Sequence, residues 1–202
     1  MLLDFSKLPA REVYGWMTGV IAPRPIAWVS TISAAGRTNL APFSFFQGVT
    51  SNPPTLLFVP VNNRDGQPKD TVRNIREVPE FVVHAVPFAL AEPMNASAAT
   101  LPYGESEFEK FNIATTPATK VRPPRVAGAP LAFECTLDRI VEVGTGPLAA
   151  HVVFGRIHLV HVSDAVLGAD GRIDAGKLDL IGRLSGEAYC RTTERFTLAR
   201  PG

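Results

Sequence analysis

Prolines and glycines interrupt the chain at short intervals, and this limits how long any regular element can be. The sequence has 202 residues, of which 18 are proline and 16 are glycine, and Val, Ile, Phe and Thr gather in short runs between them. Proline lacks a backbone N–H and glycine favours turns, so this pattern is typical of strands separated by turns. The sequence therefore predicts a mainly β protein with a few short peripheral helices.

Seven segments have the composition of strands. The first is followed by residues 34–37, where Gly36 supplies the positive φ of a hairpin turn. Because strand edges have to be hidden, we favour an antiparallel barrel, up-and-down or Greek-key, over a sandwich, although periodicity alone does not separate the two. The predicted strands are residues 26–33, 43–49, 55–61, 80–86, 131–143, 151–162 and 188–197.

Three short helices are expected between the strands. The first starts at Asp70, whose side chain we expect to cap about two turns of helix. Residues 90–98 and 105–111 are similar candidates, the second with Phe108 and Phe111 on one face. The proline-rich residues 117–130 are interpreted as a segment that crosses the surface of a single domain spanning residues 1–202, and not as a domain boundary.

The charge balance excludes several classes of partner. Lys and Arg number 20 against 19 Asp and Glu, so the net charge is +1 and there is no basic field for nucleic acid. No apolar run reaches the roughly 18–20 residues of a membrane span, and the N-terminus lacks the apolar region of an export signal. We expect a cytoplasmic protein that binds neither nucleic acid nor membrane, with Cys135 and Cys190 as free thiols.

Side-chain catalysis and metal binding find no support in the sequence. There is no G-x-S-x-G turn, and no motif brings His, Asp and a nucleophile together. His158 and His161 are three residues apart in a predicted strand, so we expect them to point to opposite faces. We interpret each of the four histidines as a hydrogen-bonded core or surface imidazole, and we expect no catalytic side chain and no metal.

Two segments are candidates for ligand binding. Lys69 and Thr71 lie at a predicted helix start, where free N–H groups, a cation and a hydroxyl favour a phosphate; the alternative is an ordinary helix start with a solvated lysine. In residues 39–46, Pro42 cannot donate to a strand ladder. This segment either presents backbone polar atoms to a planar heterocycle or forms a barrel corner with core phenylalanines.

These segments occur in a fixed order with several others, and the set resembles the flavin reductase-like family of FMN-binding split barrels, most closely its flavoredoxin-type branch. The resemblance covers about residues 15–200. It is carried by residues 24–31, 39–46, 53–54, 69–71, 74–75, 106–108, 131–135, 153–155 and 183–189.

The resemblance implies a homodimer of Greek-key split barrels that holds FMN noncovalently and uses NADH or NADPH as electron donor. In such proteins the cofactor carries the chemistry, and the protein supplies binding and orientation. Carried over by position, Lys69 and Thr71 meet the phosphate, and Asn39 shapes the flavin loop or reaches a polar edge. Arg24 is a candidate for the phosphate or the dimer contact. The residues that line the flavin are Ser30, Thr31, Ala41, Pro42, Phe43, Ser44 and Phe45.

Three versions of the function stay open. In the first, the protein releases reduced flavin to a monooxygenase component. In the second it is an electron carrier that keeps its FMN, and in the third it binds flavin, haem or another planar ligand without turnover. A homodimer is also favoured by apolar residues in long loops, namely Phe88, Met94 and Tyr103, unless these pack under their own helices.

Overall fold

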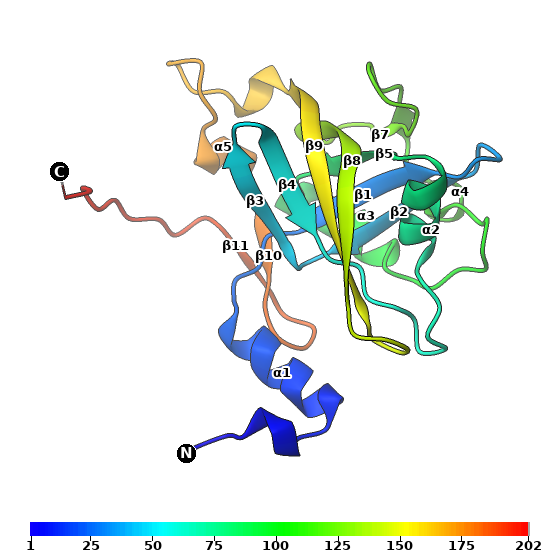
Figure 1. Ribbon diagram of the computed structural model, residues 1–202. Helices are drawn as coiled ribbons and strands as arrows, with labels where there is room; N and C mark the ends of the chain where they lie inside the picture. The colour runs from blue at the N-terminus through cyan, green and yellow to red at the C-terminus, as the bar shows by residue number, and fades with distance from the viewer. Residues whose placement is uncertain (202) are drawn as a thin grey trace.

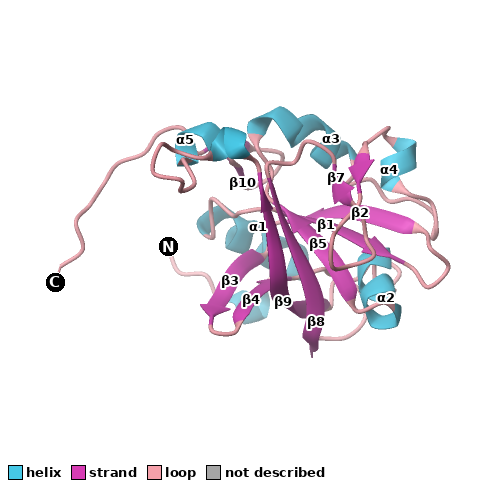
Figure 2. Ribbon diagram, turned by 90° about the horizontal axis from the view of Figure 1, so that it is seen from above, coloured by secondary structure: helices cyan, strands magenta, loops and turns pink. Residues whose placement is uncertain are grey.

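The computed structural model describes residues 1–201 and is built around one antiparallel sheet of seven strands (Figures 1 and 2). Its strand order is β2-β1-β5-β8-β9-β4-β3, so β2 and β3 are the edges. The strands are β1 Ala27–Ile32, β2 Thr38–Phe43, β3 Phe46–Ser51, β4 Pro54–Phe58, β5 Glu80–His84, β8 Leu131–Val143 and β9 Ala150–Val162. Two small ladders pair β6 Thr115–Thr116 with β7 Arg125–Val126, and β10 Ile181–Arg183 with β11 Tyr189–Arg191.

The sheet curls around an apolar interior. The ring of Phe58 in β4 meets that of Phe81 in β5 with centroids 5.5 Å apart, although three strand steps separate β4 from β5 in the sheet. Gly155 of β9 leaves room for the same ring, because a Cβ there would lie 2.3 Å from Phe81 Cζ. Contacts across the interior require a closed curvature, so the predicted antiparallel barrel is confirmed.

A second core lies outside the barrel. Side chains alternate along a strand, so β1 turns Val29 inward and Trp28 outward. Trp28 is fully buried there, and its Nε1 donates to Ser97 Oγ at 2.8 Å. Of the three apolar loop residues, Met94 is 1% exposed in this outer core, so for it the alternative holds in which it packs under its own helix. Phe88 and Tyr103 are exposed.

The helices are α1 Ala10–Val20, α2 Asp70–Glu77, α3 Ala91–Ala96, α4 Glu107–Lys110 and α5 Ala175–Leu178, with 3-10 turns at Phe5–Lys7, Phe88–Leu90 and Asp164–Val166. The predicted α2 is confirmed, and α3 and α4 are shorter than predicted. Asp70 does not cap α2: Lys69 occupies the N-cap position and Asp70 is the first helical residue. Helix α1 was not predicted from the sequence, because its two glycines and exposed aromatic residues hide its period. No helix among residues 1–201 is long and apolar enough to cross a membrane.

Most predicted strands are confirmed, and β8 has the predicted bounds. The predicted strand 43–49 is wrong, because the chain breaks after Phe43 and β2 and β3 end up at opposite edges of the sheet. The segment before it, interpreted as a loop, is β2. The predicted strand 188–197 shrinks to β11, and its partner β10 was not foreseen.

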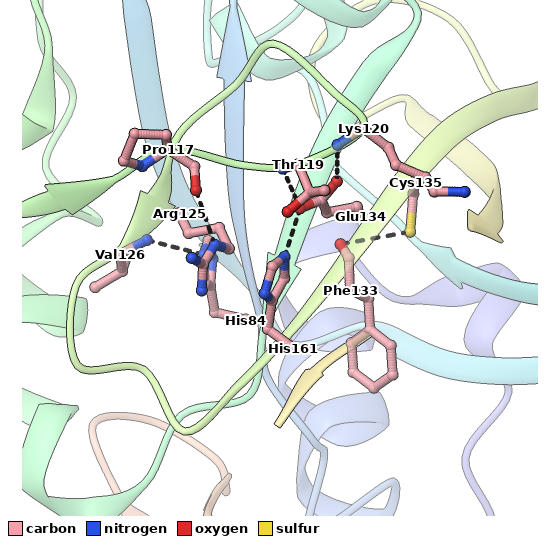
Figure 3. Close-up of polar contacts among 10 residues, drawn as sticks. All are labelled: His84, Pro117, Thr119, Lys120, Arg125, Val126, Phe133, Glu134, Cys135 and His161. Atoms are coloured by element: carbon pink, nitrogen blue, oxygen red, sulfur yellow. Dashed lines mark hydrogen bonds and ion pairs between the residues drawn. The ribbon is translucent and has the colours of Figure 1, made fainter. Parts of the chain in front are cut away.

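Buried polar groups anchor the proline-rich crossing segment (Figure 3). The carboxylate of Glu134 accepts hydrogen bonds from the backbone N–H groups of Thr119 at 2.7 Å and Lys120 at 2.5 Å, and lies 2.5 Å from His161 Nε2. Burial raises the pKa of Glu134, but these hydrogen bonds together bring it below its ordinary value. The segment, which runs from the end of β6 to the start of β8 and contains β7, is therefore a strap held against the barrel.

The histidines are satisfied by protein partners. His84 is fully buried, and burial lowers its pKa to about 4; its Nε2 accepts from Val126 N–H at 3.0 Å while Nδ1 lies 2.8 Å from Trp28 O. His151 contacts Asn62 Oδ1. His158 contacts Thr136, on the same face of β8 as the Glu134 that meets His161. The expectation of opposite faces is wrong, because a bulge at His158 shifts the register of β9.

Candidate functional site

A hollow opens where the edge strand β2, the start of α2, the segment after α3 and α4 meet. Its cavity volume is about 90 Å³, which is below the roughly 300–1,000 Å³ of sites that enclose a small molecule, so a larger ligand would extend out of it. Six of the predicted site residues line it: Asn39, Ala41, Pro42, Phe43, Lys69 and Thr71. The remaining lining residues are Asn63, Asp70, Glu107 and residues 97–101.

The outer edge of β2 gives the hollow a backbone wall. β2 pairs only with β1 in the sheet, so alternate backbone groups point away from its partner. Leu40 is one of these, because its N–H donates to Glu107 Oε2 at 2.8 Å. Pro42, two residues on, lies on the same edge and has no N–H. Between these two positions the wall therefore offers carbonyl oxygens and no free amide.

A buried polar network fixes this wall to α2. Asn39 Nδ2 donates to Thr31 Oγ1 at 3.3 Å and to Thr71 Oγ1 at 3.1 Å. Asn74 Nδ2 donates to the same Thr31 oxygen at 3.1 Å. All four residues are buried, and Asn74 Oδ1 has no hydrogen-bond partner among the described residues. Thr31 therefore orients Asn39, and Asn74 is a supporting residue that the sequence analysis missed, although it stands three positions after Thr71 on the buried face of α2.

The start of α2 supplies the cationic end of the hollow. Lys69 stands at the N-cap position, α2 has no side-chain cap, and Lys69 Nζ contacts Asn63 Oδ1 at 3.3 Å. The first N–H groups of a helix have no partner within the helix and favour an anion. Asp70 opposes an anion here, and burial raises the pKa of its carboxyl above the ordinary value.

Glu107 was not among the predicted site residues, although it lies within one of the segments that carry the resemblance. It is 6% exposed in the wall of the hollow. Burial raises its pKa to about 7, against the hydrogen bond from Leu40 and with a further upward contribution from Asp70. Nothing local in the sequence marks it, because its partner Leu40 is 67 positions away.

The other predicted site residues lie outside the hollow. Ser30 points to the outer face of β1, opposite to Thr31, and its Oγ is buried. Arg24 is buried and donates to the carbonyl oxygens of Thr18, Ile21 and Leu184 at 2.7–2.9 Å. Its Nε also meets Ser44 Oγ at 3.3 Å, and its guanidinium stands 5.9 Å from the ring centroid of Phe45. Arg24 thus ties α1 and the C-terminal segment to the β2–β3 corner.

The sequence matches the model of the flavin reductase like domain over residues 20–176. The chain belongs to this family. The flavoredoxin-type split-barrel fold expected from the resemblance is confirmed, since solved flavin reductases and flavoredoxins share it.

Relatives match over nearly the whole chain. YwrF of Bacillus subtilis, an uncharacterized protein, is 38% identical over 203 residues, which are 99% of this chain and 98% of the relative. The crystal structure of nitrilotriacetate monooxygenase component B from Bacillus cereus has a TM-score of 0.92 at 34% identity and covers 98% of each chain. That of 2-nitrobenzoate 2-nitroreductase NbaA from Pseudomonas fluorescens has a TM-score of 0.89 at 32% identity, covering 100% of this chain and 96% of the other.

FMN is the cofactor that this family implies, and the residues of the hollow fit it. A lysine, a hydroxyl and a helix N-terminus suit a phosphate. The carbonyl oxygens of the β2 edge suit a donor on the rim of a heterocycle, and Ala41, Pro42 and Phe43 supply apolar surface. The acidic pair Asp70 and Glu107 is the one feature that does not favour an anion.

Proposed function

We propose that this protein is an FMN-dependent oxidoreductase that uses NADH or NADPH as electron donor and reduces flavin. The observation that carries the proposal is that residues far apart in the sequence, from β2 and from the start of α2, line a single hollow. The family match supports the same reaction class.

The side chains act by binding and orientation. Lys69 and Thr71 hold the phosphate of FMN, and the network of Asn39, Thr31 and Asn74 keeps Thr71 and the β2 edge in place. The bound flavin supplies the hydride-accepting chemistry. No side chain has to form a covalent bond with the substrate, so the contribution of the protein is proximity and a fixed approach.

We further propose that the reduced flavin is released to a monooxygenase component. The likeness to a monooxygenase component B at 34% identity supports this version over that of an electron carrier. The likeness to a 2-nitroreductase names a second acceptor class, a nitroaromatic compound reduced on the protein. A nitroaromatic acceptor that is consumed without added oxygenase would favour that second version.

The exposed apolar surface of α1 supports a homodimer. Tyr14, Trp16, Met17 and Val20 are 54%, 39%, 37% and 75% exposed, and α1 lies beside the barrel with much of its apolar surface in solvent (Figure 1). Surfaces of this kind are normally buried by association. Sedimentation at micromolar concentration tests the dimer, and a monomer there would contradict it.

The decisive experiment is one absorption series in a single cuvette. The purified protein is titrated with FMN, made anaerobic, and mixed with NADH and then with NADPH. Bleaching of the flavin absorption by either nucleotide, faster than for free FMN, is the expected result. Binding without bleaching would instead support a barrel that holds flavin without turnover, and absence of binding would contradict both versions.

A further inference from the structure

Glu107 occupies a place in the hollow that phosphate binding and hydride transfer do not explain. Its carboxyl is buried against the outer edge of β2, where it accepts a hydrogen bond from Leu40 N–H at 2.8 Å and also interacts with the backbone N–H of Glu107 itself. The same hollow holds Asp70 and a single cation, Lys69. A site built only for an anion has no use for two carboxyl groups.

The charges around Glu107 are few. β2 carries no charged side chain, and neither do residues 97–101, which line the same hollow. α2 contributes Lys69 and Asp70, which act on Glu107 in opposite directions. On its own segment, Glu105, Glu109 and Lys110 are exposed to solvent, where their fields are screened. The state of Glu107 therefore depends mainly on burial and on what enters the hollow.

We infer that Glu107 takes up a proton when an anionic ligand such as FMN binds in this hollow, so that it couples ligand affinity to pH. The inference rests on the proposed function, because it assumes that FMN binds here. An arriving negative charge and the loss of water both disfavour a second negative charge at Glu107. With the ligand absent, its carboxyl already titrates near neutrality, with a pKa of about 7, so a further rise has a measurable effect.

The sign follows from linkage. When the pKa of Glu107 is higher in the complex than in the free protein, the affinity for FMN is constant at pH values well below the pKa of the free protein. As pH rises above that pKa, the affinity for FMN falls. A rise of one pKa unit, from about 7, makes FMN binding about sixfold weaker at pH 8.5 than at pH 6.5. The phosphate of FMN loses its second proton near pH 6, so over this range its own titration does not weaken binding.

The experiment is calorimetric titration of the protein with FMN at pH 7.5, in buffers of different ionisation enthalpy. The dependence of the heat on the buffer counts the protons taken up, and we expect about half a proton per site for a shift of one pKa unit. The measurement needs no substitution. Affinities at pH 6.5, 7.5 and 8.5 complete it.

Three variants assign the proton. Glu107→Gln keeps an acceptor for Leu40 N–H and should abolish both the proton uptake and the fall in affinity. Glu109→Gln, the matched control, is an exposed glutamate on the same helix and should retain both. Asp70→Asn tests the second carboxyl of the hollow, and uptake should persist in it.

The outcomes separate the two proposals. FMN binding with no proton uptake, or uptake lost in Asp70→Asn and kept in Glu107→Gln, overturns the inference and leaves the proposed function intact. Failure of FMN to bind at any pH overturns the proposed function and with it this inference.

Discussion

Glu134 and Glu107 are both buried carboxyl groups, and their surroundings shift their pKa values in opposite directions. Glu134 accepts two backbone N–H groups and contacts His161, and its pKa is below the ordinary value. Glu107 accepts from Leu40 N–H, interacts with its own backbone N–H and shares its hollow with Asp70, and burial raises its pKa to about 7. Burial alone does not decide the charge; the hydrogen-bond donors and the neighbouring charged groups do. Glu134 anchors the strap, whereas Glu107 lies beside a candidate ligand site with a pKa close to neutral pH.

The largest difference should appear when each carboxyl is removed. Glu134→Ala leaves two amides and His161 without their partner and should lower the free energy of unfolding by roughly 3–5 kcal/mol. Glu107→Ala leaves Leu40 N–H unpaired and should cost about 1–3 kcal/mol. Urea unfolding at pH 7 measures both. Equal losses would mean that the two carboxyls contribute alike and that the comparison fails.

The pH dependence of stability should distinguish the two residues next. The pKa of Glu107 in the folded state lies above the unfolded value near 4.5. Its contribution to the free energy of unfolding is therefore fully present below pH 4.5 and is lost as pH rises to about 7. The free energy of unfolding of the Glu107→Gln variant, relative to that of wild type, should therefore rise by roughly 3 kcal/mol between pH 4.5 and pH 8. For Glu134 the folded pKa is lowered, so its contribution is present above the unfolded value and is lost as pH falls below it. Urea unfolding at several pH values checks both signs, and parallel curves for wild type and Glu107→Gln would contradict the first.

A lysine stands near each carboxyl, and only one should matter for FMN. Lys69→Ala removes the cation of the hollow and should weaken FMN binding by roughly 10–100-fold, as expected for a charged hydrogen bond. Lys120→Ala, beside Glu134, changes an exposed side chain and leaves the backbone donor in place. Its FMN affinity should equal that of wild type. Fluorescence titration with FMN measures both, and an equal loss in the two variants would point to general charge attraction.

The smallest effect is expected at the surface of the strap. Arg122 Nε meets Glu80 Oε2 at 3.1 Å, in a pair that is exposed to water. Arg122→Ala should change the free energy of unfolding by less than about 1 kcal/mol. A loss of stability comparable to that of Glu134→Ala would mean that this ion pair, and not the buried carboxylate, anchors the strap.

The fold was largely predictable from the sequence, and the predictions that were wrong have local causes. Regular alternation located β8, which has the predicted bounds. A single inserted residue, His158, reversed the expected faces of two histidines, because a bulge leaves no mark in the sequence period. The missed helix α1 buries only Thr18 within the chain, so its apolar residues do not follow the pattern of a buried face.

The candidate site was predictable only in part. The residues next to Lys69 and Thr71 predict a helix start, and Pro42 predicts a strand position without an N–H. Both predictions need only a few neighbouring residues. Glu107 and Asn74 had no such signal, since their partners Leu40 and Thr31 are 67 and 43 positions away. Arg24 was predicted to contact a phosphate or the dimer partner. The sequence did not predict its hydrogen bonds to α1 and to the C-terminal segment.

The sequence by itself determined the β class, the family and the residue types that could hold a phosphate, because periodicity, turn chemistry and ordered motifs are local properties. Tertiary structure decided which of those residues share a hollow, and it decided the charge of each buried carboxyl. Desolvation and hydrogen bonding depend on distant segments that the fold brings together. Two glutamates with the same chemistry therefore became a fixed anchor at Glu134 and a titratable group at Glu107.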